Sequence, residues 1–343
     1  MIEMKNDHLV FSFPDVHPHA QLEITFQRTL RIPDDDKTYP LPPGLGAFPL
    51  RHVDDFAESV PPTWMEHGGV MLPMYQSEAM WLLFSGGYDG ERQVRYPVAI
   101  KVATGKIDAV TGKTWSNGLH RGPQDYMITP GQPWLDGYCV EKGVIRQFVA
   151  MPLGGGYTAE EQITGKAEHG GLQVIAYPMK REVFERRFPK RYGEEFMLDI
   201  VRAPCCAAPS ASAEMGLAPG GKMKQEIYAD PYDFDDWDLT QSSRCFVHIA
   251  NSFAWKLITK QTPPNPPPTA ADYTRWGLPW FDYYDDSLKA VQGSGVLAKL
   301  KSVLGLAKEK REHPLPENES CDPKKVVKIV SKRVGDQVRE GTF

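Results

Sequence analysis

The chain has 343 residues, of which 41% are hydrophobic and 24% charged, and its formal net charge is −5. This composition is typical of a globular protein with one large domain or two ordinary ones, and the acidic balance gives no electrostatic reason to expect a nucleic-acid partner. No apolar run approaches the roughly 20 residues of a membrane helix, so we expect no membrane partner either.

Short strands dominate the first half of the chain. Residues 22–26 alternate apolar and polar side chains, as a half-buried strand does, and the apolar run at 79–84 predicts a buried strand. Residues 96–110 and 138–149 each read as a hairpin, and Gly143 supplies the left-handed residue that the second connection needs. Hairpins favour antiparallel pairing, because parallel neighbours need long crossovers.

The motif Glu-His-Gly-Gly occurs twice, and an apolar run follows each copy. The first copy is residues 66–69 and precedes the run at 70–75; the second is residues 168–171 and precedes the run at 172–179. Each copy predicts a tight glycine turn that leads into a strand, with a histidine at the entry.

Between these runs and the C-terminus, several helices and one long loop are expected. Thr158 and Glu161 fit a capping box, and residues 180–188 have one apolar face, so both segments predict short helices. Residues 204–222 are rich in Ala, Pro, Ser and Gly, which is typical of a loop or linker.

The remainder mixes helices, strands and an extended segment. We expect a strand at 244–249, polyproline structure at 263–268, and either a strand or a helix at 326–330. Helices are predicted at 253–259, at 269–276 with Thr269 as the N-cap, and at 297–311.

Together these elements predict an α+β, β-rich fold. Its core is a mainly antiparallel, sandwich-like sheet with a few short helices, followed by a helical, proline-rich C-terminal region. We expect a β-rich core domain at 1–203, an Ala/Pro/Gly-rich loop or linker at 204–222, and a smaller α+β region at 223–343.

The cysteines and the N-terminus point to a reducing compartment. The five cysteines are odd in number and show no Cys-x-x-Cys spacing, and the N-terminus has no apolar segment typical of a secretory signal. We therefore predict a cytoplasmic protein with free thiols at Cys139, Cys205, Cys206, Cys245 and Cys321.

Several familiar enzyme motifs are incomplete. Residues 112–114 look like the end of a phosphate loop, but Ile107 stands where that loop needs glycine. Residues 98–101 imitate the start of a kinase, yet the chain has no Asp-Phe-Gly, and we expect Lys101 to face solvent on its strand. The chain also has no Gly-x-Ser-x-Gly, which excludes the usual serine esterase.

The two motif histidines offer a catalytic alternative. If the two turns met, His67 and His169 could bind a metal or activate water together with Glu66, Glu168 or Asp136. The other interpretation is that each histidine is a polar turn residue bonded to the backbone. That interpretation is the simpler one, because spacing alone gives no ligand geometry.

An acidic loop follows residue 229. Neither register of this loop places glycine and glutamate where an EF-hand needs them, so we expect a solvated turn without a bound metal. A looser calcium site is the alternative, and its candidate ligands are Asp230, Asp233, Asp235, Asp236 and Asp238.

Aromatic residues gather after the polyproline stretch. Each ring buries on the order of 150–250 Å² when packed, so the group has to dock on its own domain, on a second subunit or around a ligand. The predicted interaction residues are Tyr273, Trp276, Trp280, Phe281, Tyr283 and Tyr284.

The sequence therefore favours a structural or protein-interaction protein that self-associates through this aromatic arm and carries no cofactor. The competing hypothesis is a hydrolase, metal-dependent or carbohydrate-directed, that uses His67, His169 and nearby carboxylates. A carbohydrate-binding module without catalysis is a third hypothesis.

Overall fold

The computed structural model describes residues 1–190, 214–283, 285, 287–313 and 316–329. Strands outnumber helices, and most helices are short. The strands are β1 (Ile2–Lys5), β2 (His8–Ser12), β3 (Gln21–Thr29), β4 (Thr38–Tyr39), β5 (Gly44–Ala47), β6 (Arg51–His52), β7 (Val70–Met74), β8 (Ala79–Gly86), β9 (Tyr88–Asp89), β10 (Val94–Arg95), β11 (Val98–Thr104), β12 (Ile107–Asp108), β13 (Met127–Thr129), β14 (Trp134–Leu135), β15 (Gly137–Glu141), β16 (Val144–Pro152), β17 (Leu172–Pro178), β18 (Glu214–Lys224), β19 (Ser243–Asn251), β20 (Trp280–Tyr283) and β21 (Val326–Ile329).

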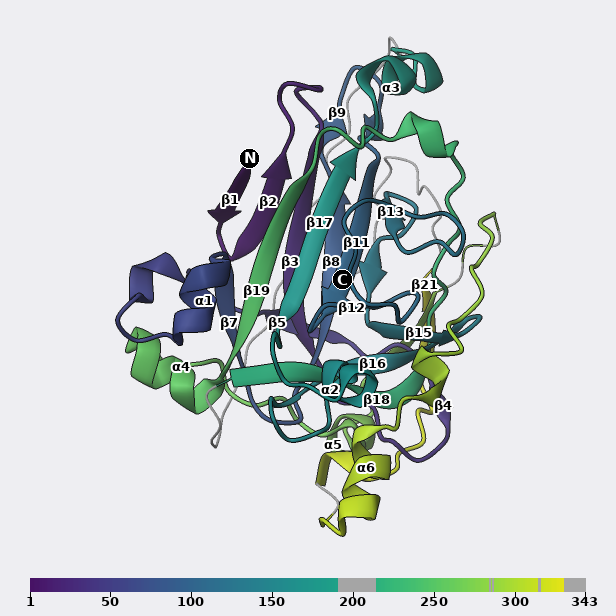
Figure 1. Cartoon of the computed structure of the whole chain (residues 1–343). Helices are drawn as coiled ribbons and strands as arrows, with labels where there is room; N and C mark the ends of the chain where they lie inside the picture. Colours follow the sequence, from purple (N-terminus) through teal and green to yellow (C-terminus); the bar gives the residue numbers. More distant parts are fainter. Residues whose placement is uncertain (191–213, 284, 286, 314–315, 330–343) are drawn as a thin grey trace, which may run out of the picture.

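The helices lie around the sheet rather than within it (Figure 1). The α-helices are α1 (Pro62–His67), α2 (Ala159–Thr164), α3 (Arg181–Arg187), α4 (Ser252–Thr259), α5 (Ala270–Arg275) and α6 (Val303–Lys310), and the 3-10 turns are η1 (Asp54–Phe56), η2 (Phe234–Asp236), η3 (Leu297–Lys299) and η4 (Pro316–Asn318). None of the helices in the described part of the chain has the length and apolar character needed to cross a bilayer.

Hydrogen bonds join 17 of the strands into one network that forms two facing layers. In one layer β2 pairs antiparallel with β3, β3 with β8, and β8 with β16. In the other layer β11, β17 and β19 pair antiparallel, and β7 runs parallel to β19. Figure 1 shows β11, β17 and β19 in front of β3 and β8. Strand β18 connects the layers, because it pairs with both β16 and β19.

The main core lies between these layers and follows from the strand patterns. Leu22, Ile24 and Phe26 on β3 alternate with more polar residues, and all three are buried with apolar residues of β8, β11, β17 and β19. Burial of apolar surface of this kind is the main favourable contribution to folding. The predicted β-rich fold, with a mainly antiparallel sheet and few short helices, is confirmed.

Most local predictions match the structure. The two hairpins form as β11–β12 and β15–β16, and Gly143 has a φ of 75°. Thr158 and Glu161 make the capping box of α2, and Thr269 caps α5. The helix expected at 297–311 is shorter: Ser302 caps it by accepting a hydrogen bond from the Gly305 N–H, so α6 begins at Val303.

The loop predicted at 204–222 is wrong for its second half, which belongs to β18. A Cβ atom at Gly220 would lie 2.5 Å from Val149 Cγ2, and one at Gly221 would lie 2.4 Å from the Pro33 carbonyl oxygen. The glycines there serve close packing between strands, which gives the segment the composition of a loop. Residues 204–213 lie outside the described residues.

The three-part division of the chain stays a prediction, although strands from both sides of it share one sheet. Strand β19, from the C-terminal region, pairs with β17 and β7 of the N-terminal region. Of the predicted thiols, Cys139, Cys245 and Cys321 are free, and Cys205 and Cys206 lie outside the described residues.

The repeated glycine turns flank one residue of β19. Val247 pairs with Val70 of β7 on one side and with Leu172 of β17 on the other, so both turns enter the sheet at the same level. A Cβ atom at Gly69 would lie 2.1 Å from the Phe246 carbonyl oxygen, and one at Gly171 would lie 2.5 Å from that of Val247. The motif recurs because two strands need the same close approach to β19.

Replacing Gly69 should therefore destabilise the fold through a backbone clash. We expect Gly69→Ala to lower the free energy of unfolding by about 2 kcal/mol or more beyond the effect of Gly68→Ala. Gly68 is the matched control, because it also has a positive φ but a Cβ atom added there would meet no other atom within 4 Å. Chemical denaturation of both variants measures the difference, and equal losses would contradict the role given to the approach.

Candidate acid–base site

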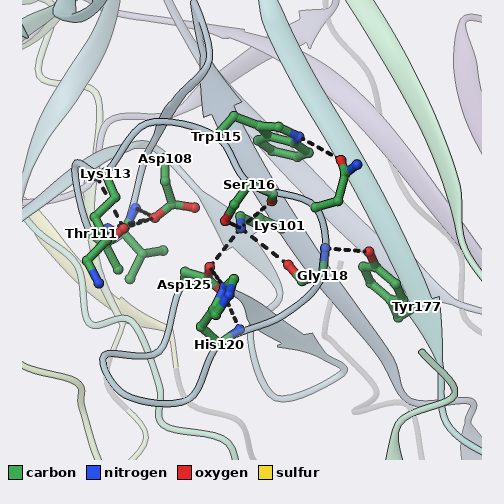
Figure 2. A network of polar contacts seen from close by, with 12 residues as sticks. Lys101, Asp108, Thr111, Lys113, Trp115, Ser116, Gly118, His120, Asp125 and Tyr177 are labelled. Carbon is green, nitrogen blue, oxygen red and sulfur yellow. Dashed lines mark hydrogen bonds and ion pairs between the residues drawn. The ribbon is translucent and has the colours of Figure 1, made fainter.

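A cluster of charged side chains lies where a long loop folds against β11 (Figure 2). The loop joins β12 to β13 and carries Ser116, Gly118, His120 and Asp125. Lys101, from the middle of β11, reaches under this loop and is 1% exposed. The sequence-based expectation that Lys101 faces solvent is therefore wrong, because the loop covers this part of the strand.

The ammonium group of Lys101 is fully paired. Its Nζ donates to Asp125 Oδ2 at 2.7 Å, to the Ser116 carbonyl at 2.9 Å and to the Gly118 carbonyl at 3.3 Å. The Trp115 ring lies over it, with its centroid 5.2 Å from Nζ. A buried cation is tolerated only with such partners, so Lys101 fastens the loop to the sheet.

Asp125 also orients His120. Asp125 Oδ1 accepts from the His120 backbone N–H at 2.8 Å, and Oδ2 lies 2.8 Å from His120 Nδ1. The Asp125 side chain is 7% exposed, whereas that of His120 is 53% exposed. Because a carboxylate accepts hydrogen bonds, this contact favours the tautomer with the proton on Nδ1, in which Nε2 is an acceptor.

Asp108 is a second buried carboxyl group at the same site. Its Oδ1 accepts from Thr111 Oγ1 at 2.7 Å and from the backbone N–H groups of Val110 and Thr111. Its Oδ2 is buried and has no hydrogen-bond partner among the described residues. Burial raises the pKa of Asp108 to about 7, with a smaller contribution from the charge of Asp125. Figure 2 shows the Asp108 carboxyl group pointing toward the Lys101 ammonium group.

These groups line one small pocket of about 150 Å³. Its wall combines two lysines, three hydroxyl side chains, two carboxyl groups and one histidine, so it suits a small polar molecule. The lining residues are Lys101, Asp108, Thr111, Lys113, Thr114, Ser116, His120, Pro123 and Asp125. A histidine held by a carboxylate, beside a carboxylic acid with a pKa near neutrality, can accept and donate protons in one reaction.

The two motif histidines do come together, but in an aromatic stack. The ring centroids of His67 and His169 are 6.1 Å apart, and His67 stacks on Phe246 at 4.5 Å. His248 also stacks on Phe246, at 4.4 Å, and its ring centroid is 6.1 Å from that of His67. Burial lowers the pKa of His67 and His169, and that of His248 to about 3, so the neutral rings are favoured.

Of the three carboxylates expected beside these histidines, Glu66 and Glu168 lie at the surface, and Asp136 is buried and accepts from Gln225 Nε2 at 2.7 Å. Glu168 forms an exposed ion pair with Lys166 at 2.8 Å, and Glu66 is exposed. Within the described ranges, no group of three or more His, Cys, Asp or Glu side chains is arranged to hold a metal ion. A catalytic role for His67, His169, Glu66 and Glu168 stays a prediction.

Sequence reasoning missed the residue that shapes the second turn. Glu160 is 2% exposed, and its carboxylate accepts three backbone N–H groups, from Glu168 and His169 at 2.9 Å and from Gly170 at 2.8 Å. This arrangement holds the turn that presents His169. A glutamate on the capped first turn of α2 was the only sequence signal for it.

The acidic loop is neutralised by protein groups. Asp230 is buried and accepts from Tyr126 Oη at 2.7 Å and Trp237 Nε1 at 2.9 Å. Asp233 and Asp236 both pair with Arg187, at 3.0 and 2.5 Å. Asp238 caps the turn at Thr240, and Asp235 is exposed. The expected solvated turn is thus partly a packed, ion-paired turn.

The aromatic segment docks mainly on its own chain. Trp280 is fully buried, 6.0 Å from the Tyr39 ring and 6.3 Å from Tyr273, in a second apolar cluster that includes Leu30 and Ile145. Phe281 and Tyr283 are half-buried against this cluster, Trp276 is 62% exposed, and Tyr284 lies outside the described residues.

The raised pKa of Asp108 makes stability depend on pH. Because its pKa is 3.8 for the ordinary group and about 7 in the fold, the native state binds more protons in this interval. The contribution of Asp108 to the free energy of unfolding is fully present below pH 3.8. It is lost as pH rises toward 7, by at most about 1.4 kcal/mol per pH unit. We expect Asp108→Asn to flatten the fall in unfolding free energy across this range, measured by denaturant titration.

The exposed Asp55→Asn serves as the matched control. Asp136, which is buried against Gln225 and whose pKa is also raised to about 7, remains in every variant, so part of the slope should persist. An Asp108→Asn slope identical to that of the parent chain would contradict the protonated state of Asp108.

Comparison with known proteins gives no further guide. No protein-family model matches the chain, and no curated protein or solved structure shows significant similarity to it. Any function assigned to the chain therefore rests on its own residues.

Proposed function

We propose that the protein is a hydrolase that cleaves a small polar carboxylic ester, with His120 as general base and Asp108 as general acid. The observation that carries this proposal is the presence, in one pocket, of a carboxylate-oriented histidine and a buried carboxyl group with an unpaired oxygen. Burial raises the pKa of Asp108 to about 7, as a general acid near neutral pH requires, and a histidine side chain can accept a proton in the same range.

His120 has the features of a general base. Asp125 fixes the ring through Nδ1, and Lys101 pairs with the same Oδ2 atom. The ring itself is half exposed, so water reaches Nε2. The same division of roles, with a buried carboxylate behind a histidine, recurs in unrelated hydrolases.

Asp108 supplies the proton that the leaving group requires. The water oxygen forms a new C–O bond to the ester carbonyl carbon while one of its protons passes to His120 Nε2. The π pair of the carbonyl moves onto the carbonyl oxygen and re-forms the C=O bond when the alcohol leaves. The bond to the alcohol oxygen then breaks, and Asp108 Oδ2 protonates that oxygen. Transfer of the proton from His120 to Asp108 through solvent restores both groups, so the net reaction consumes one water and yields an acid and an alcohol.

The rest of the pocket fits a polar substrate. Lys113 lies at the exposed rim, where its charge can stabilise a carbonyl oxygen as negative charge develops on it. The hydroxyl groups of Thr114 and Ser116 also line the pocket. The volume of about 150 Å³ restricts the substrate to a small molecule.

Two kinds of ester separate the roles of the acid and the base. Alkyl esters have a poor leaving group that needs protonation, whereas p-nitrophenyl esters do not. We expect His120→Gln to slow hydrolysis of both kinds about 100-fold, and Asp108→Asn to slow only the alkyl esters to that extent. Proton release and p-nitrophenol absorbance measure the two rates.

The matched control is His52→Gln, which replaces an exposed histidine on β6 and should leave both rates unchanged. If the parent chain hydrolysed no small ester faster than buffer, or if His120→Gln matched the parent rate, the hydrolase proposal would fail. Equal effects of Asp108→Asn on both ester classes would remove Asp108 as the acid.

We propose self-association as a second function, on a separate observation. Strand β21 pairs with β20, and all of its residues are exposed, including Val326 at 45%, Val327 at 42% and Ile329 at 43%. An exposed apolar strand at a sheet edge is a template for pairing with another chain. The occupant that we propose is β21 of a second copy, which would bury the same residues on both sides.

A charge on this strand should separate the copies. We expect Val327→Lys to reduce the mass measured by light scattering to that of a monomer, because a lysine on an edge strand opposes pairing. Val296→Lys is the matched control, since Val296 is 46% exposed outside the strand. A monomeric parent chain would contradict this second function. Deleting the whole segment is a poorer test, because Trp280 and Tyr273 belong to an apolar cluster.

A further inference from the structure

A second pocket, of about 120 Å³, lies beside Arg31 and away from the acid–base site. Arg31 follows β3, and the opposite walls come from the turn between β7 and β8, from the polyproline residues 266–268 and from Glu317 on η4. The predicted polyproline segment therefore forms one wall of this cavity.

Arg31 is the unusual residue of this pocket. It is 2% exposed, and its Nε, Nη1 and Nη2 atoms are all buried without a hydrogen-bond partner in the described part of the chain. Buried guanidinium groups are normally paired, because an unpaired buried charge is strongly destabilising. The pocket therefore presents a complete set of donors with no acceptor supplied by the described residues.

One acidic side chain of the wall, Glu78, already accepts hydrogen bonds from other groups. Glu78 Oε1 accepts from Arg28 Nε at 2.8 Å and from Arg28 Nη2 at 2.6 Å, and Glu78 Oε2 accepts from the Tyr75 N–H at 2.9 Å. Arg28 also donates to the carbonyl of Asn265, which holds the polyproline segment in place. The Arg28–Glu78 pair thus builds the wall and leaves the charge of Arg31 unmatched.

Glu317 brings an unpaired negative group to the same pocket. Its Oε2 is buried without a hydrogen-bond partner among the described residues, and it acts on Arg31 only through space. The wall of one small pocket therefore contains a cation and an anion whose buried polar atoms do not bond to each other. A ligand that satisfies both must carry an anionic end and a cationic end.

We propose that this pocket binds a small zwitterion of the amino-acid class. Its carboxylate accepts two parallel hydrogen bonds from the Arg31 guanidinium, and its ammonium group donates to Glu317 Oε2. A volume of about 120 Å³ corresponds to roughly four waters, which limits the ligand to about six non-hydrogen atoms, the size of glycine or alanine.

Three probes distinguish this ligand class from simpler ones: L-alanine, acetate and ethylamine. Because a ligand that binds only the native state raises its melting temperature, we expect a dose-dependent rise with L-alanine, a smaller rise with acetate and none with ethylamine. No shift with any probe, or equal shifts with L-alanine and acetate, would overturn the proposal. A crystal structure of the soaked protein with water alone between Arg31 and Glu317 would do the same.

Substitutions assign the two ends of the ligand. We expect Glu317→Gln to weaken L-alanine binding about 10-fold and to leave acetate binding unchanged, whereas Arg31→Gln should abolish both. Glu319→Gln, at an exposed glutamate on the same segment, is the matched control. If Arg31→Gln does not fold, Glu317→Gln still decides: unchanged L-alanine affinity would overturn the proposal. Ester hydrolysis of the parent chain is independent of this result, because the pockets share no residue.

Discussion

The structure depends on how charge is accommodated inside a β-rich core. A buried ionic group has to be paired and hydrogen-bonded, because the loss of its hydration on burial is strongly unfavourable without such partners. Lys101 with Asp125, and Arg28 with Glu78, meet this condition, and each pair fastens a loop or an extended segment to the sheet. The exceptions are therefore informative. Asp108 and Arg31 are buried with unsatisfied atoms, and each lines a pocket.

Much of the fold could be predicted from the sequence, because period-two alternation and turn chemistry act locally. Residues 22–26 alternate as β3 does, and Gly143 marks its hairpin. The segment 214–222 could not be recognised as a strand. Its glycines are required by close contacts with residues such as Val149 and Pro33, which are distant in sequence. The two Glu-His-Gly-Gly copies predicted turns correctly, but only the pairing of β19 shows that they meet.

The candidate site was harder to predict, because it has no sequence motif. Lys101 lies on β11, Asp108 on β12 and Asp125 on the loop that follows β12, and the path of that loop brings Asp125 to the other two (Figure 2). One signal was available: Lys101 stands within the apolar run of residues 98–102, where a lysine has to find a partner if the strand is buried. The conspicuous histidines and aromatic residues were more visible, yet His67 lies in a stack and Trp280 in a core.

The polyproline segment has a consequence for how the molecule is assembled. Arg31 leaves the ribosome long before residues 265–268 and Glu317, so the early sheet presents a bare guanidinium to water while the remainder is synthesised. Enclosure of that group is a late event, coupled to docking of the last segments of the described chain. A small solute that neutralises Arg31 would favour this closing step and would stabilise the closed protein.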